Sequence, residues 1–216
     1  MTVAAVEEYR VPVAQRDAFL AAVRESFGLA SGHGAGTSLR STLVGAELTD
    51  VLSAVFTFPD AIARRAYLDV VTDPGTTLDA MDRILFHGNV TRLGRTFLDE
   101  IPATNEATEP PLVVSSISFR VSPGREAETD QALLAGVELR RGLGIEAHLY
   151  VVQYAGSRTG LRTLAIHGAS HEALARDAAA VVANRQRLGG LGPIPLAIAA
   201  GAMAMTDNSV SNLVAV

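Results

Sequence analysis

Residues 115–137, SSISFRVSPGREAETDQALLAGV, contain the pattern from which the fold of this protein is inferred. Apolar and polar residues alternate up to the letters FRV at 119–121, as expected of a strand with one buried face. The letters SPG at 122–124 interrupt this strand, and apolar residues then return at helical spacing. The stretch therefore predicts a strand that leads directly into an amphipathic helix.

A second copy of this pattern lies earlier in the chain, as VEEYRVPVAQRDAFLAAV at residues 6–23. Its letters YRV at 9–11 precede the FRV letters by 110 residues, and such internal repetition indicates two related structural units. Residues 102–111, PATNEATEPP, are polar and rich in proline, which is typical of a linker. We therefore predict an N-terminal unit at 1–101, a linker at 102–111 and a C-terminal unit at 112–216.

Both units are expected to continue with the same order of elements, β-α-β-β-α-β, which is the ferredoxin-like or split βαβ unit. The predicted fold class is α+β, with tandem ferredoxin-like repeats. In the first unit the expected strands are 5–11, 38–44, 51–58 and 95–101, and the expected helices are 14–29, 60–71 and 76–86. In the second unit the expected strands are 113–121, 147–154, 161–168 and 201–206, and the expected helices are 125–139 and 171–188.

The segment ISFRVSPGREAETDQALLAGVELRR, followed by a hairpin and the helix HEALARDAAAVV, resembles the antibiotic-biosynthesis monooxygenase group of dimeric α/β barrels. In that group a strand ending in RV.PGRE leads into the first helix. The resemblance is strongest over residues 113–185 and continues, more weakly, over 5–75. It implies that two ferredoxin-like units form one barrel. Two chains supply these units in most relatives, whereas one chain carries both here, as an intramolecular dimeric-type α/β barrel.

The resemblance also implies a function in secondary metabolism, on a small hydrophobic or aromatic substrate of the polyketide type. The expected activity is that of a monooxygenase that uses molecular oxygen without metal or flavin. A polyketide cyclase of the same fold, and a ligand-binding or stress-response barrel without catalysis, remain the alternatives. Haem-degrading enzymes have similar units, but they rely on a tryptophan, and this chain contains none.

Strand alternation in the second unit identifies the expected lumen face. If the hairpin turns symmetrically through residues 155–160, the numbers of two residues that pair across its strands add up to 315. His148 is therefore expected opposite His167. Either imidazole suits the role of a base, because it titrates near neutral pH. The aliphatic face is Leu149, Val151, Leu164 and Ile166, and the face toward the lumen is His148, Tyr150, Tyr154, Thr163 and His167.

Other polar residues are expected around these histidines. Tyr150 or Tyr154 is a candidate donor to a substrate oxygen, with Tyr150 grouped with the two histidines as catalytic. Arg40 or Arg120 is a candidate for stabilising an enolate. Inward alternation on the remaining strands adds Ser118. The expected substrate-binding residues are then Tyr154, Arg40, Arg120, Ser118 and Thr163.

Metal and cofactors are not expected. His167 and His171 are four residues apart, but a strand ends and a helix begins between them, so they do not form a helical zinc pair. A 2-His-1-carboxylate site would need an acid beside His148 and His167, for which Glu146 is the nearby candidate. The glycine-rich letters GHGAG and GGLG lack the spacing of a nucleotide-binding loop, and no Gly-x-Ser-x-Gly turn supports hydrolysis.

Composition excludes several classes of partner and mechanism. The 18 basic residues are all arginine, and the absence of lysine excludes Schiff-base chemistry and a Gly-Lys phosphate loop. A net charge of −5 argues against nucleic acid, and the absence of cysteine excludes thiolate catalysis. The most apolar run, 191–205, is shorter than the roughly 20 residues of a membrane helix, and no export signal is recognised. We expect a cytoplasmic monomer with an internal pseudo-dimer, or a homodimer.

Overall fold

The structure is a computed structural model, and it describes residues 2–44, 51–72, 90–101, 111–154, 156–187 and 192–215. The first half of the chain contains β1 (Val3–Arg10), η1 (Val13–Gln15), α1 (Arg16–Gly32), β2 (Gly36–Val44), β3 (Val51–Phe58), α2 (Ala61–Thr72) and β4 (Thr91–Glu100). The second half contains β5 (Val113–Val121), α4 (Glu126–Arg141), β6 (Ala147–Tyr154), η2 (Gly156–Arg158), β7 (Arg162–Gly168), α5 (His171–Arg187), α6 (Pro193–Ala199) and β8 (Met203–Val214).

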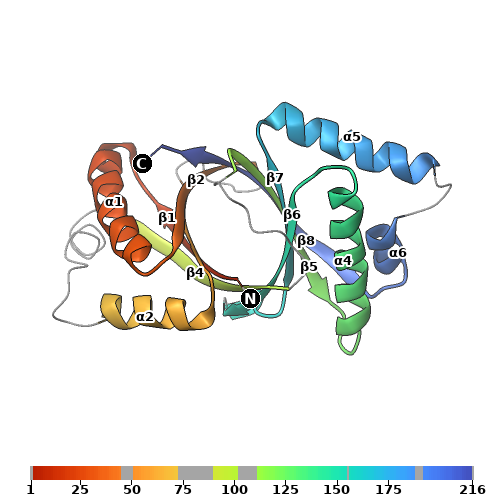
Figure 1. Ribbon diagram of the computed structural model, residues 1–216, viewed down its shortest axis with the longest axis horizontal. Helices are drawn as coiled ribbons and strands as arrows, with labels where there is room; N and C mark the ends of the chain where they lie inside the picture. Colours follow the sequence, from red (N-terminus) through yellow and green to blue (C-terminus); the bar gives the residue numbers. More distant parts are fainter. Residues whose placement is uncertain are drawn as a thin grey trace.

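The described strands form one closed antiparallel barrel in the order β1-β3-β2-β8-β5-β7-β6-β4. The first four strands of the chain lie side by side as β4-β1-β3-β2, and the last four lie as β8-β5-β7-β6. In each set of four, the fourth strand in sequence lies beside the first, and the second strand in sequence lies at the opposite edge of the set. Two seams, β2 with β8 and β4 with β6, join the halves. Figure 1 shows the strands around the barrel axis with the helices outside, α1 and α2 at one side and α4, α5 and α6 at the other.

Each half packs its helices on the outer face of its own strands. In the first half the buried cluster joins Phe19 and Val23 of α1 to Leu39, Phe56 and Phe58 of the sheet. A second cluster does the same between the second-half strands and α4; it comprises Phe119, Leu133, Val137, Ala147, Leu149, Leu164, Ala197, Ala202 and Met203. These two cores account for the aliphatic strand face, and the predicted alternation is therefore correct for the residues that form them.

Local sequence explains where the helices begin and end. The Ala173 backbone NH donates to the Ser170 hydroxyl over 3.1 Å, so Ser170 caps α5, and Asp60 accepts from the Ala63 NH in the same way at α2. Acidic residues in the first turn of α4 and arginines in its last turn complement the helix dipole. At Gly136 an added Cβ would lie 2.6 Å from Ile194, because α6 packs closely against α4.

Two expectations from the sequence are wrong. The pattern predicts the last strand at 201–206, but β8 runs from Met203 to Val214, because it pairs with β5 over residues 203–212 and with β2 over residues 210–214 and so closes the barrel. The short helix α6 is not expected within the proline-containing run before that strand. The expected helix 76–86 and the linker residues 102–110 lie outside the described residues.

The predicted β6–β7 register is also wrong, by two residues. His148 pairs with Ala165 and Tyr150 pairs with Thr163, so paired positions sum to 313 rather than 315. The reason is the loop: hydrogen bonds join Val152 to Leu161 and Gly160, and β6 then continues beside β4 alone while η2 reverses the chain. Because the shift is two residues, His148 and His167 keep the same face.

Among the described helices, none combines the length and the apolar character that crossing a membrane requires.

Candidate functional site

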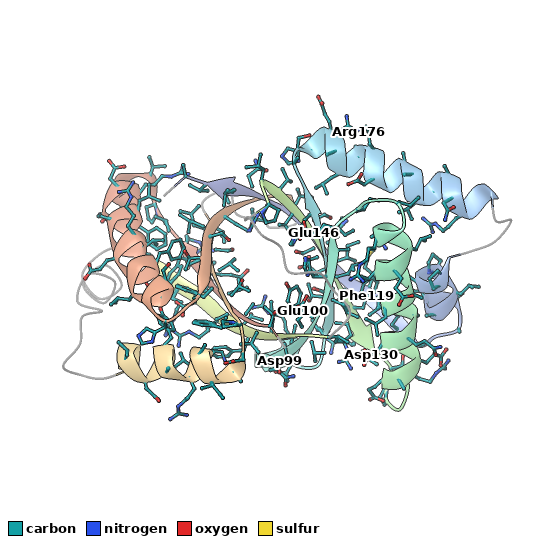
Figure 2. The ribbon with its side chains drawn as sticks, viewed as in Figure 1. Asp99, Glu100, Phe119, Asp130, Glu146 and Arg176 are labelled. Carbon is teal, nitrogen blue, oxygen red and sulfur yellow. The ribbon has the colours of Figure 1, made fainter. Side chains whose placement is uncertain are left out.

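Four ionisable side chains form a continuous hydrogen-bonded network on the inner side of the barrel. They are Glu100 at the end of β4, Glu146 immediately before β6, His148 on β6 and His167 on β7. Leu149, the neighbour of His148, belongs to the core under α4, so His148 faces the lumen. Figure 2 shows Glu100 and Glu146 on this inner side, whereas the labelled Phe119 lies between the strands and α4.

The distances between the nitrogen and oxygen atoms of this network are those of direct hydrogen bonds. His148 Nδ1 lies 2.8 Å from Glu100 Oε1, and its Nε2 lies 3.0 Å from Glu146 Oε1. The same Glu146 oxygen lies 3.1 Å from His167 Nδ1. The two imidazole rings are 4.6 Å apart between centroids. The predicted histidine pair is thus brought together, diagonally across the ladder rather than on one rung.

The two carboxylates that contact His148 favour its positively charged form. Burial opposes its charged form, but the hydrogen bonds and negative charges of Glu100 and Glu146 outweigh burial, so the pKa of His148 is raised. Each ring nitrogen then donates one hydrogen bond to a carboxylate. The pKa of Glu146 is lowered, because its hydrogen bonds to the two imidazoles outweigh its partial burial.

His167 is the neutral member. Burial, followed by the charge of His148, lowers the pKa of His167 to about 4. A neutral His167 whose Nδ1 donates to Glu146 carries its lone pair on Nε2. A carboxylate that fixes the tautomer and leaves one imidazole nitrogen as an acceptor is the arrangement of a general base.

The next rung of the lumen carries three more of the predicted residues. Tyr150 pairs with Thr163 and stacks beside the His148 ring, with 6.2 Å between the ring centroids. Burial, together with the charges of Glu100 and Glu146, raises the pKa of Tyr150, so it remains a hydroxyl donor at neutral pH. The hydroxyls of Thr163 and Ser118 are 3.1 Å apart and hydrogen bonded to each other.

The two predicted arginines lie in different surroundings. Arg40 on β2 is buried, and its charge contributes to lowering the pKa of His167, so the two are close enough to interact. Arg120 is exposed and lies six residues along β5 from Val114, the residue that pairs with His167. The structure therefore brings Arg40 to the candidate site and leaves Arg120 away from it. Tyr154 pairs with Phe97, but its side chain lies outside the described residues.

Glu100 is not among the residues predicted from sequence. It contacts His148 because β4 of the first half pairs with β6 of the second, and this closure has no local sequence signal. Glu146, in contrast, is two residues before His148 and therefore on the same face, which is why the sequence already suggests it as a candidate metal ligand.

The donor atoms of Glu146, His148 and His167 lie within 4.8 Å of one another, so within the described ranges this group has the composition of a 2-His-1-carboxylate site. A metal ion there would replace the protons between Glu146 and the two rings. In the hydrogen-bonded form the His148 imidazolium lies between the two carboxylates, and each of its ring nitrogens contacts one of them. Each contact between these histidines and carboxylates therefore has the length of a direct hydrogen bond.

No protein-family model and no curated protein sequence matches this chain. Solved structures do match it. A candidate monooxygenase from Fusobacterium nucleatum subspecies nucleatum is 10% identical, with a TM-score of 0.64, over 99% of this chain and 93% of that one. A haem-binding protein from Thermus thermophilus is 11% identical, with a TM-score of 0.58, over 99% and 91%. An anthrone oxidase-like protein is 10% identical, with a TM-score of 0.55, over 99% and 92%. At these identities the likeness shows the fold.

The two histidines of this site fit haem poorly. A haem iron is commonly held by an imidazole nitrogen, but both ring nitrogens of His148 are hydrogen bonded to carboxylates. Nε2 of His167 remains, yet this ring lies 4.6 Å from the ring of His148, whose positive charge opposes a second cation.

Proposed function

We propose that the chain is a tandem of two ferredoxin-like units, bounded as 1–101 and 112–216, that close one barrel around a shared lumen. The support is that the described strands and longer helices follow the order β-α-β-β-α-β in both halves, with α6 added before β8 in the second, and that the strands have the same order within the sheet. In this proposal one unit contributes Glu100 and Arg40, and the other contributes the two histidines.

We further propose that the protein is a cofactor-independent monooxygenase that acts on an aromatic, polyketide-like small molecule. The observation that carries this proposal is His167: a neutral imidazole whose Nδ1 is held by Glu146 and whose Nε2 is left as a proton acceptor. Solved structures of the same fold include proteins described as monooxygenases and as anthrone oxidase-like, which is consistent with this class.

The chemistry follows from the charges of the site. His167 Nε2 removes a proton from an activated C–H group of the substrate, and the C–H electron pair stays on the substrate as a carbanion. This electron-rich carbanion reduces oxygen, and the two combine to a carbon-bound peroxide anion. Proton return from His167 gives the hydroperoxide. Loss of water from that hydroperoxide, with the second hydrogen on the same carbon, leaves a carbonyl group.

A base whose pKa is about 4 is available at physiological pH but is weak. The site must therefore stabilise the carbanion as it forms. The His148 imidazolium, whose ring lies 4.6 Å from that of the base, supplies positive charge, and Tyr150, whose ring stacks beside His148, supplies a hydroxyl donor. Stabilisation by neighbours, rather than a strong base, is thus the source of reactivity in this proposal.

The proposal is tested with anthrone as the probe. We expect the protein to accelerate its oxidation and to consume one O2 for each anthraquinone and water formed, measured with an oxygen electrode and by absorbance against a reaction without protein. Treatment with EDTA should leave the rate unchanged. Conversion of a poly-β-ketone without oxygen uptake would support the cyclase, and a rate no higher than in the reaction without protein would contradict the monooxygenase for this class of substrate.

The dependence of kcat/KM on pH is a second test of the base. We expect activity to fall on the acid side only near pH 4, as His167 becomes protonated, because its pKa is about 4. On the alkaline side activity should fall above the ordinary histidine pKa of about 6.5, as His148 loses its proton at its raised pKa. An acid limb near pH 6.5 would show that the essential base is a histidine with an unshifted pKa.

A further inference from the structure

Arg40 is a buried cation for which the described residues provide no negative partner. Its side chain lies on β2, between Ser53 of β3 and Leu213 of β8 in the ladder, and the residue is 7% exposed. Nη2 donates to the Pro111 carbonyl over 2.8 Å. Nη1 is buried and has no hydrogen-bond partner, and no carboxylate of the described residues lies within 4.0 Å of this guanidinium.

Such a side chain is costly unless something pairs with it. A buried charge that lacks a counter-ion loses its hydration without compensation. Burial lowers the pKa of Arg40 only to about 10, so the guanidinium stays charged at neutral pH. Another buried arginine of the barrel strands, Arg162, shows the usual solution, because it forms two hydrogen bonds to Asp130.

The ladder relates Arg40 to the candidate site. Thr42 pairs with Ser211, Ser211 pairs with Val114, and Val114 pairs with His167, so these four residues form one row across β2, β8, β5 and β7. Arg40 is two residues from Thr42 and therefore points to the same face. An anion on Arg40 Nη1 would thus lie in the lumen, on the face that carries the general base.

We propose that Arg40 binds a carboxylate that the substrate carries in its ground state, so that the substrate is an aromatic carboxylic acid. This inference rests on the proposed function for the location of the site, and it adds the class of substrate. Because Nη1 has no hydrogen-bond partner among the described residues before substrate binds, the anion is expected to bind before the reaction begins rather than to form during it. A charge-assisted hydrogen bond of this kind increases affinity by about 10- to 100-fold.

The test compares 2-naphthoate with 2-naphthamide, which has a similar shape but no charge, by isothermal titration at pH 7.5 in the absence of any turnover. The wild-type protein should bind the naphthoate at least about tenfold more tightly. Arg40→Met should abolish this preference and leave binding of the amide unchanged. Arg120→Met is the matched control, since that arginine is exposed, and it should keep the preference.

Each other outcome contradicts the proposal. Equal affinity of the wild-type protein for the two ligands, or no binding of either at millimolar concentration, would show that Arg40 does not recognise a carboxylate. A retained preference in Arg40→Met would show the same. If Arg40→Met does not fold, Arg40→Lys is used, which keeps the charge but loses the two-pronged donor and should reduce the preference without abolishing it. Oxygen uptake with anthrone, which has no carboxylate, is independent of these results.

Discussion

Substitution of His167 by alanine is expected to lower kcat/KM by about 10²- to 10⁴-fold, which is the usual contribution of a general base. The expected loss follows from geometry, because Nε2 of His167 is the imidazole nitrogen of the pair for which the described residues provide no carboxylate. His167→Gln should behave similarly, since its amide can still hydrogen bond to Glu146 but cannot accept a proton. The measurement is steady-state oxygen uptake, with folding checked by circular dichroism.

His171→Ala is the matched control for this substitution. His171 is exposed at the start of α5, only four residues away, and its removal should leave turnover within about twofold of wild type. His148→Ala should also reduce turnover, because it removes the cation beside the base and leaves Glu100 and Glu146 without the imidazolium between them. Wild-type turnover in both His148→Ala and His167→Ala would show that the base lies elsewhere.

The candidate site can be predicted from sequence only as far as local periodicity extends. Alternation along β6 and β7 places His148, Tyr150, Thr163 and His167 on one face, and the structure has them there. The face is correct despite a wrong register because the error is two residues, the period of a strand. An error of one residue would have separated the pair.

What cannot be predicted depends on contacts between distant segments. Glu100 contacts His148 through the β4–β6 seam, and no alternation within either strand encodes that pairing. The length of β8 is underestimated for the same reason, since its second half has polar letters, DNSVSN, and is a strand because it pairs with β2 and β5. The β6–β7 register depends on a loop in which Gly156 and Gly160 adopt positive φ, which permits η2 instead of a symmetric turn.

The two faces of β7 should separate stability from activity, and Leu164→Ala is the substitution with the largest expected effect on stability. Leu164 is completely buried in the core beneath α4, opposite Leu149 and Ile117 in the ladder. Its truncation should lower the free energy of unfolding by about 2–5 kcal/mol, through lost burial and the cavity that remains. Urea titration measures this change, and the kcat of the folded fraction should stay within about threefold of wild type.

Thr163→Ala, one residue earlier on the opposite face, is the control for that separation. It removes a single hydrogen bond to Ser118, so it should cost only about 1 kcal/mol of stability. Its kcat/KM should fall further than that of Leu164→Ala, because Thr163 pairs with Tyr150, whose ring stacks beside that of His148. If Leu164→Ala costs less than Thr163→Ala in stability, the helix-covered face of β7 is not the one that holds the fold together, and the assignment of the lumen face fails with it.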